Sequence, residues 1–218
     1  MTNPHLLAVR RQHPPFLRAV AADARCHLAY RGEGHEFTSK VRLVIQIIRL
    51  CWVADAFLAQ VMYRARVRLE RFRVPLIPAI LHRLSMIHSQ VCIGSPVVIE
   101  PGLYIAHGQV VVDGFTSLES GVVIFPWVTI GLRGGKLRGP HIGAGTHIGT
   151  GAKVIGPVVV GGNVRIGANA VVTTDIPSEM VAAGIPARVI KGVEPLAPSI
   201  YEPPRIDAEL RLVNLEVQ

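Results

Sequence analysis

The sequence has few aromatic residues and few cysteines. Only 6% of its 218 residues are Phe, Trp or Tyr, which suits a narrow interior filled by aliphatic side chains rather than a core built on large rings. The three cysteines, Cys26, Cys51 and Cys92, are odd in number and lack a Cys-x-x-Cys spacing. The sequence therefore predicts neither a disulfide framework nor a zinc site, and we expect reduced thiols in a cytoplasmic protein.

Long hydrophobic runs are also missing. Residues 1–22 are broken by prolines and lack the uninterrupted apolar core of a signal peptide. The most hydrophobic segment, residues 41–63, is interrupted by Arg42, Arg49 and Asp55. Because charged residues at such positions are costly in a bilayer, we expect no transmembrane helix there.

Acidic residues are scarce in the first part of the chain. Residues 1–90 hold 14 Lys and Arg against 5 Asp and Glu, a net charge of +9, whereas residues 91–218 hold 9 against 10. The Arg-rich segment 62–73 predicts either a helix that contacts an anionic membrane or polysaccharide surface, or a solvated face paired with a neighbouring subunit. No zinc, helix-turn-helix or aromatic nucleic-acid motif accompanies this charge, so we expect no nucleic-acid partner.

The spacing of apolar residues predicts an α-helical region over residues 1–90, with helices over 16–30, from about 39, over 62–73 and over 79–87. In the second of these helices the apolar residues share one face, and Arg42, Gln46 and Arg49 turn away from it. The members of that apolar face are Val41, Val44, Ile45, Ile48 and Trp52, and Phe57 is a further candidate.

From residue 91 to 192 an aliphatic residue recurs at every sixth position. Neither the 3.6-residue period of a helix nor the two-residue alternation of a strand produces this spacing, whereas a parallel β-helix does, with three short faces per turn. One run comprises Ile93, Ile99, Ile105 and Val111; after a one-residue slip the next comprises Leu118, Ile124 and Ile130; the last comprises Ile142, Ile148, Val154, Val160, Ile166 and Val172.

Two segments depart from this period. Residues 131–141 are basic and Gly-rich where the repeat requires an aliphatic residue, so they are predicted to form a loop that leaves the coil. Residues 193–218 are rich in proline and are predicted to form an extended strap over the end of the solenoid. The predicted organisation is thus a helical region (1–90), a β-helix domain (91–192) and a C-terminal strap (193–218).

Three motifs carry a resemblance to a known family. They are Ala183-Gly-Ile-Pro-Ala-Arg188, Ile105-Ala-His-Gly108 and Val128-Thr-Ile-Gly131. The first resembles the C-terminal signature of left-handed β-helix acyltransferases of the hexapeptide-repeat superfamily, and the others resemble serine acetyltransferases and polysaccharide O-acetyltransferases. The resemblance implies a mainly β protein with a left-handed parallel β-helix, acetyl transfer from acetyl-CoA to a hydroxyl group, and a homotrimer with its active site between adjacent subunits.

Acetyl transfer to a hydroxyl group needs a base, because a neutral hydroxyl is a poor nucleophile. His107, between the small residues Ala106 and Gly108, is the first candidate, and His141 beside the predicted loop is the second. Ala106 stands where the serine enzymes carry an aspartate and cannot orient an imidazole. Another carboxylate should do so, and the candidates nearest in sequence are Asp113 and Glu119.

The resemblance also implies where coenzyme A lies. The corresponding contacts fall on Gly149, Thr150, Gly151, Ala168, Thr173, Arg188 and Lys191. The glycines would let the pantetheine arm approach the backbone, and the two cations would meet the nucleotide phosphates. The chemistry requires no metal.

Three functions remain open at this point. The first is acetyl transfer to serine or a similar small hydroxyl compound, although Cys92 and Ala106 replace two aspartates of the serine enzymes. The second is acetylation of a sugar hydroxyl in surface polysaccharide synthesis. The third is a non-catalytic β-helix scaffold that binds an acidic partner.

Overall fold

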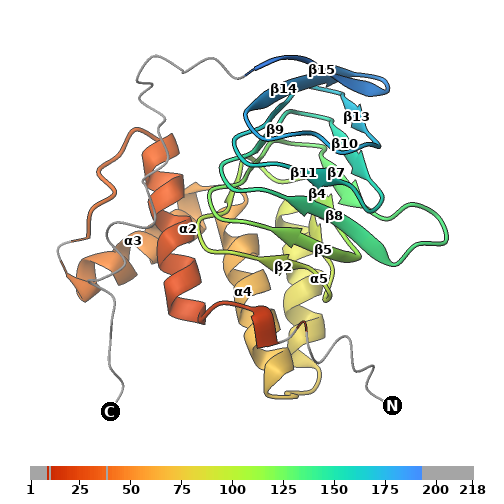
Figure 1. The fold of residues 1–218 in the computed structure, drawn as a ribbon. Coiled ribbons are helices and arrows are strands. Elements are labelled where there is room, and N and C mark those ends of the chain that lie inside the picture. The colour runs from red at the N-terminus through yellow and green to blue at the C-terminus, as the bar shows by residue number, and fades with distance from the viewer. Residues whose placement is uncertain (1–8, 10, 38, 193–218) are drawn as a thin grey trace.

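The computed structural model describes residues 9, 11–37 and 39–192 of the chain. Within these residues the four helices α2 to α5 precede a three-sided β-solenoid of parallel strands, and Figure 1 shows them gathered against one side and the first turn of the solenoid. The predicted strap lies outside the described residues. Within the described residues no helix combines the length and apolarity that a membrane crossing requires.

The solenoid consists of three sheets whose strands follow one another around the axis. The first sheet contains β1 (Val91–Ile93), β4 (Val110–Val112), β7 (Thr129–Gly131), β10 (Lys153–Ile155) and β13 (Val171–Val172). The second contains β2 (Val98–Ile99), β5 (Phe115–Leu118), β8 (Arg138–Ile142) and β11 (Val159–Val160). The third contains β3 (Tyr104–Ile105), β6 (Val123–Ile124), β9 (His147–Ile148), β12 (Arg165–Ile166), β14 (Met180–Gly184) and the antiparallel β15 (Ala187–Gly192).

Aliphatic side chains fill the axis of the solenoid, as the six-residue period predicts. Ile105, Ile148 and Val160 are at most 1% exposed, and the other predicted axial residues except Val111 are buried too. One assignment is wrong: Val111 is 40% exposed, and its neighbour Val112 points inward instead. The one-residue slip therefore lies one six-residue unit earlier than expected, between β3 and β4.

The predicted loop leaves the coil. Thr129 of β7 pairs with Lys153 of β10, a step of 24 residues, whereas Lys153 pairs with Val171 of β13 after the regular 18. The extra residues form the segment between β7 and β8, residues 132–137, which projects from the solenoid in Figure 1. The predicted bounds of 131–141 were too wide, because Gly131 ends β7 and residues 138–141 belong to β8.

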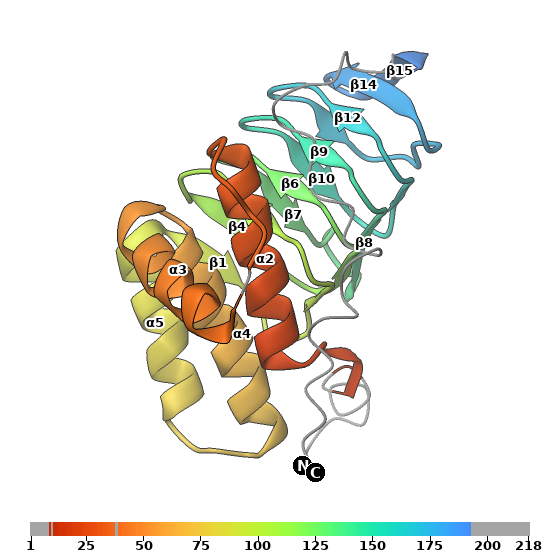
Figure 2. The same ribbon diagram turned by 90° about the vertical axis from the view of Figure 1, so that its left-hand side faces the viewer.

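Helix α2 (Phe16–Tyr30), which occupies its predicted range, lies along the third sheet (Figure 2). The Tyr30 ring stacks on Tyr104 of β3 at 4.2 Å between centroids, and its hydroxyl lies 3.3 Å from Nε2 of His147 on β9. Helices α4 (Phe57–Arg71) and α5 (Ile77–Ser89) pack together at the β1 end of the solenoid. The helices therefore bury the open end of the coil and one of its sides.

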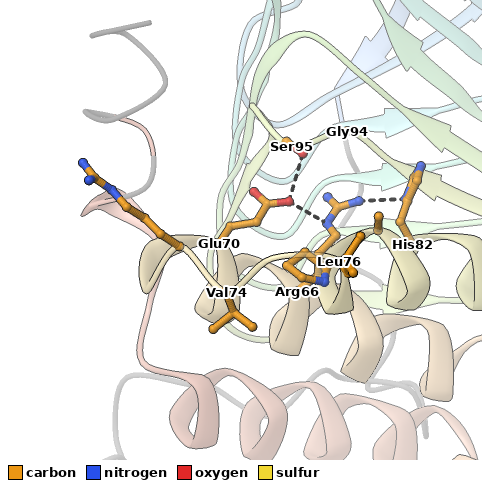
Figure 3. Close-up of a pocket in the computed structure, with 10 residues that line it drawn as sticks. Arg66, Glu70, Val74, Leu76, His82, Gly94 and Ser95 are labelled. Atoms are coloured by element: carbon orange, nitrogen blue, oxygen red, sulfur yellow. Dashed lines mark hydrogen bonds and ion pairs between the residues drawn. The ribbon is translucent and has the colours of Figure 1, made fainter. Parts of the chain in front are cut away.

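Two of the arginines that the sequence assigned to a cationic helix surface are buried instead. The Arg64 side chain is 2% exposed and forms a two-point ion pair with Asp23 of α2. Arg66 lines a cavity of about 450 Å³ between α4, α5 and the β1–β2 turn, where it contacts His82 and Glu70 (Figure 3). Their charge is used inside the fold, because their positions on α4 face the solenoid.

Helix α3 (Lys40–Val53) shows the opposite departure. Its apolar face, defined by Val41, Val44, Ile45, Ile48 and Trp52, is exposed, and Trp52 is 91% exposed. The helix packs inward through Ile47, Leu50 and Cys51, with Leu50 fully buried. An apolar stripe normally marks the buried face of a helix, so this exposed stripe is a feature that the protein must use or shield.

Candidate active site

The turn between β3 and β4 carries His107 away from the solenoid. The step from the inward-facing Ile105 to Val112 is seven residues rather than six. The backbone accommodates the extra residue through positive φ angles at His107 (63°), Gly108 (100°) and Gln109 (56°). A Cβ on Gly108 would lie 2.3 Å from the last backbone oxygen of α5, so only glycine fits there. The imidazole is consequently 75% exposed.

Asp55, in the link between α3 and α4, supplies the carboxylate beside His107. Its Oδ2 atom lies 2.8 Å from Nδ1 of the imidazole. Because a carboxylate only accepts hydrogen bonds, Nδ1 carries the hydrogen, and Nε2 is the basic nitrogen. The Ser89 hydroxyl donates to the backbone oxygen of Asp55, and the Gln109 N–H donates to the backbone oxygen of Ser89 at 2.9 Å. Three elements therefore position the pair.

The pair lines a cavity of about 320 Å³. Its other walls include Trp52, Ile87 and Gln109. The cavity thus offers a base, an aromatic face and an amide within one space, which suits an acceptor that carries both a hydroxyl group and apolar or ring surface.

A neighbouring cavity of about 420 Å³ extends along the outer face of the first sheet and shares Gln90 and Gln109 with the first. Cys92, Trp127 and Lys153 line it. Burial raises the pKa of the Cys92 thiol, which disfavours the nucleophilic thiolate. Trp127 has a φ of 60°, which is unusual for a bulky residue and is found where the surrounding structure enforces it.

The structure assigns the two carboxylates proposed from the sequence to other partners. Asp113 accepts a hydrogen bond from the Gly114 N–H at 2.7 Å, in the turn after β4. Glu119 lies 3.2 Å from Nε2 of His141 and accepts from the Ala144 N–H. The carboxylate that contacts His107 is Asp55, which is distant in sequence.

His141 lies on β8 of the second sheet, whereas His107 lies at the corner between the third and first sheets. Both ring nitrogens of His141 are engaged, because Nδ1 also lies 2.8 Å from the Ser117 hydroxyl. His141 and His107 are therefore separate candidates within one chain. Among the described residues, no three His, Cys, Asp or Glu side chains gather closely enough to hold a metal ion.

Several of the predicted coenzyme A residues share a solenoid edge with His107. Successive corners between the third and first sheets are joined by backbone hydrogen bonds of 2.8 Å: Trp127 N–H to Gln109, Gly151 N–H to Pro126, and Asn169 N–H to Thr150. Gly149, Thr150, Gly151 and Ala168 lie on these corners. The Ala168 corner is three coils above His107, roughly 14 Å at the usual spacing of strands.

The remaining predicted residues lie nearer the far end of the solenoid. Thr173 follows β13, and Arg188 and Lys191 belong to β15. The small residues also have a packing role, since a Cβ on Gly149 would lie 2.7 Å from the Ile166 backbone oxygen. Arrangement along one edge is consistent with an extended ligand, but glycine at 149 is required by the coil itself.

Sequence reasoning missed Asp55, Gln109 and both tryptophans as site residues. For Trp127 a signal existed, since it occupies a corner position where other coils carry small or polar residues. For Asp55 no local signal existed, because only the packing of the α3–α4 link against the His107 turn makes it a partner.

The family described as Bacterial transferase hexapeptide (six repeats) matches residues 139–174. A serine acetyltransferase of Synechococcus elongatus is 37% identical over 147 residues, which cover 66% of this chain and 59% of that protein. The chain thus spans less than two thirds of the length of this curated relative.

Solved structures agree with the fold. The serine acetyltransferase of Neisseria gonorrhoeae has a TM-score of 0.68 at 25% identity, with 83% of this chain and 68% of that chain covered. The same enzyme in complex with serine has a TM-score of 0.66 at 26% identity, with 79% and 68% covered. The likeness extends into the helical region, because coverage of this size exceeds the solenoid alone.

Proposed function

We propose that the chain is a left-handed β-helix protein of the hexapeptide-repeat superfamily and an acetyl-CoA-dependent O-acetyltransferase of the serine acetyltransferase-like type, as its similarity to these proteins supports. The observation that carries this proposal is the exposed His107–Asp55 pair, which lies at a cavity on the solenoid. A scaffold without catalytic function would have no need of a seven-residue step that presents a histidine to a carboxylate.

In the proposed reaction, His107 Nε2 removes the proton from the acceptor hydroxyl as the oxygen attacks the carbonyl carbon of acetyl-CoA. The tetrahedral intermediate then collapses, the carbon–sulfur bond breaks, and the imidazolium returns the proton to the departing thiolate. Asp55 holds the required tautomer through Nδ1 and stabilises the transient imidazolium. The products are an acetyl ester and free coenzyme A.

Acetyl-CoA would lie along the edge of corners above His107. The pantetheine arm would pass Thr150, Gly151 and Ala168, and the cations Arg188 and Lys191 of β15 would lie toward the nucleotide. This direction places the thioester at the His107 turn, where the acceptor cavity begins.

Two acceptor classes fit the cavity. Serine or a similar small hydroxyl compound is supported by the relatives, one of which binds serine. A sugar hydroxyl is supported by Trp52, since an exposed ring in the wall of the cavity is suited to stacking against a sugar face. Either class would meet the same base.

We further propose a homotrimer, in which the loop at residues 131–141 of one subunit reaches a cleft shared with its neighbour. The enzyme is proposed to act in the cytoplasm in peripheral contact with an anionic membrane. Light scattering at micromolar concentration tests the assembly, and a monomeric mass would contradict it.

The activity is tested by release of free thiol from acetyl-CoA with a panel of serine, amino-alcohol and sugar acceptors. His107→Ala should lower kcat by about 10² to 10⁴ with little change in acetyl-CoA affinity, because a positioned base contributes that much. His88→Ala is the matched control, since His88 lines the same cavity but has no ion pair among the described residues. Full activity of His107→Ala with loss in His141→Ala would move the base to β8.

A further inference from the structure

Helices α3 and α5 both carry exposed apolar residues, and the two sets meet at the His107–Asp55 cavity, which Trp52 and Ile87 both line. On α3 the residues Val41, Val44, Ile45, Ile48 and Trp52 follow helical spacing and are all more than half exposed. On α5 four apolar residues also follow helical spacing and are at least 43% exposed. They are Ile77, Ile80, Leu84 and Ile87. Together these nine residues form what we call the apolar surface.

The apolar surface ends at the His107–Asp55 cavity. Trp52, at the end of the α3 stripe, and Ile87, at the end of the α5 stripe, both line that cavity. Asp55 follows Trp52 by three residues, so the base and its partner lie at the rim of this surface. A molecule seated on the surface would therefore have its polar end beside the imidazole.

Apart from the Asp55 carboxylate at its rim, the charged side chains on the two helices of the apolar surface are positive. Neither α3 nor α5 contains an acidic residue, and Lys40, Arg42 and Arg83 are exposed on them. The helical region carries a net charge of +9 over residues 1–90. A second copy of this chain docked face to face would bring two such regions together, whereas an anionic lipid surface has the complementary charge.

We infer that the apolar surface lies in the interface of an anionic membrane and that the acceptor is a hydroxyl presented from that membrane by an amphiphilic carrier. An apolar stripe with Trp, flanked by cations, is the arrangement that inserts shallowly into the headgroup region. Helix α3, with 14 residues, spans about 21 Å and would lie in the plane of the membrane. The part of this inference that concerns the acceptor rests on the proposed function, and the part that concerns membrane binding does not.

The first test is sedimentation of the full chain with phosphatidylglycerol–phosphatidylcholine vesicles and with phosphatidylcholine vesicles alone. The full chain should sediment with the anionic vesicles and bind them less at high salt. Val44→Ser/Ile48→Ser should weaken binding at least tenfold. Ile185→Ser is the matched control, because Ile185 is 75% exposed at the other end of the solenoid, and it should bind like the wild type.

The second test follows the environment of Trp52 in a Trp127→Phe background, where Trp52 is the only tryptophan. Addition of anionic vesicles should shift its emission to shorter wavelength. An unchanged emission together with no sedimentation would overturn the inference. So would a fall in mass for Val44→Ser/Ile48→Ser in lipid-free solution, since that result assigns the surface to a second copy.

The third test compares acetyl transfer to a soluble hydroxyl acceptor with transfer to the same headgroup on an acyl chain in vesicles. Val44→Ser/Ile48→Ser should lose rate only with the vesicle acceptor. If the wild type binds vesicles but cleaves no thioester with any acceptor, the proposed function fails and membrane binding stands. If it acetylates soluble acceptors but neither binds vesicles nor prefers the acyl-linked acceptor, the inference fails and the proposed function stands.

Discussion

Removal of the buried Arg64 guanidinium should lower the free energy of unfolding, because this side chain joins the helical region to the solenoid. Its Nε and Nη2 atoms lie 3.0 and 3.1 Å from the two carboxylate oxygens of Asp23, and Nη1 and Nη2 also donate to the backbone oxygens of Ile99 and Glu100. Asp23 in turn accepts from the N–H of Gly102 at 2.9 Å. One ion pair thus joins α2, α4 and the first coil.

The magnitude follows from burial of both partners, which are 2% and 1% exposed. Arg64→Met leaves the Asp23 carboxylate buried without its counter-ion. Asp23→Ala likewise leaves the Arg64 guanidinium buried without a counter-ion. Breaking a buried pair from one side costs about 3–5 kcal/mol. The double variant Asp23→Ala/Arg64→Met should cost less than the sum of the single variants, because it leaves no unpaired buried charge.

Urea denaturation followed by circular dichroism measures these free energies of unfolding. Arg71→Met on the same helix is the matched control, because Arg71 is exposed and surface substitutions usually change stability by no more than about 0.5 kcal/mol. The reasoning would be refuted if Arg64→Met and Arg71→Met unfolded at the same urea concentration, or if the single effects simply added.

Three further outcomes are expected. Val160→Asp should destabilise the chain by several kcal/mol, since it buries an unpaired carboxylate in the axis, and a wild-type melting temperature would contradict the assigned register. Burial lowers the pKa of His27 and of His147 to about 4, so between about pH 6.5 and pH 4 the unfolded chain binds protons that the folded chain does not. The free energy of unfolding should therefore fall as pH drops through that window, and a flat series of urea midpoints would contradict this. Thr150→Trp should raise the KM for acetyl-CoA at least tenfold with little change in thermal stability, and an unchanged KM would place the pantetheine arm elsewhere.

The solenoid could be predicted from the sequence because its contacts are local. Each six-residue unit pairs with the unit about eighteen residues away. The aliphatic residues that fill the axis therefore recur in the sequence with a regular six-residue spacing. The loop after β7 was visible for the same reason, as a break in that period. The slip was misplaced by one six-residue unit because Val111 and Val112 are chemically equivalent, and only the pairing of Val112 with Ile130 selects the inward residue.

The environment of the charged and apolar helix residues was decided by tertiary packing. Arg64 and Arg71 lie on the same helix, and the sequence alone does not distinguish their environments. In the structure Arg64 faces Asp23, whereas Arg71 faces solvent. The stripe on α3 has the spacing of a buried face, but the fold turns it outward. Periodicity reports which residues share a face, and it does not report which partner that face will meet.

His107 could be selected as a base from its small neighbours and its place in the repeat, whereas Asp55 could not. The two residues are separated by 52 positions, and no pattern in either segment relates them. They meet because the α3–α4 link and the end of α5 close over the first corner of the solenoid, through the bonds of Ser89 to Asp55 and Gln109. The sequence by itself determined the coil and the candidate base, and the docking of the helices onto the coil decided which carboxylate contacts the His107 imidazole and which surface surrounds it.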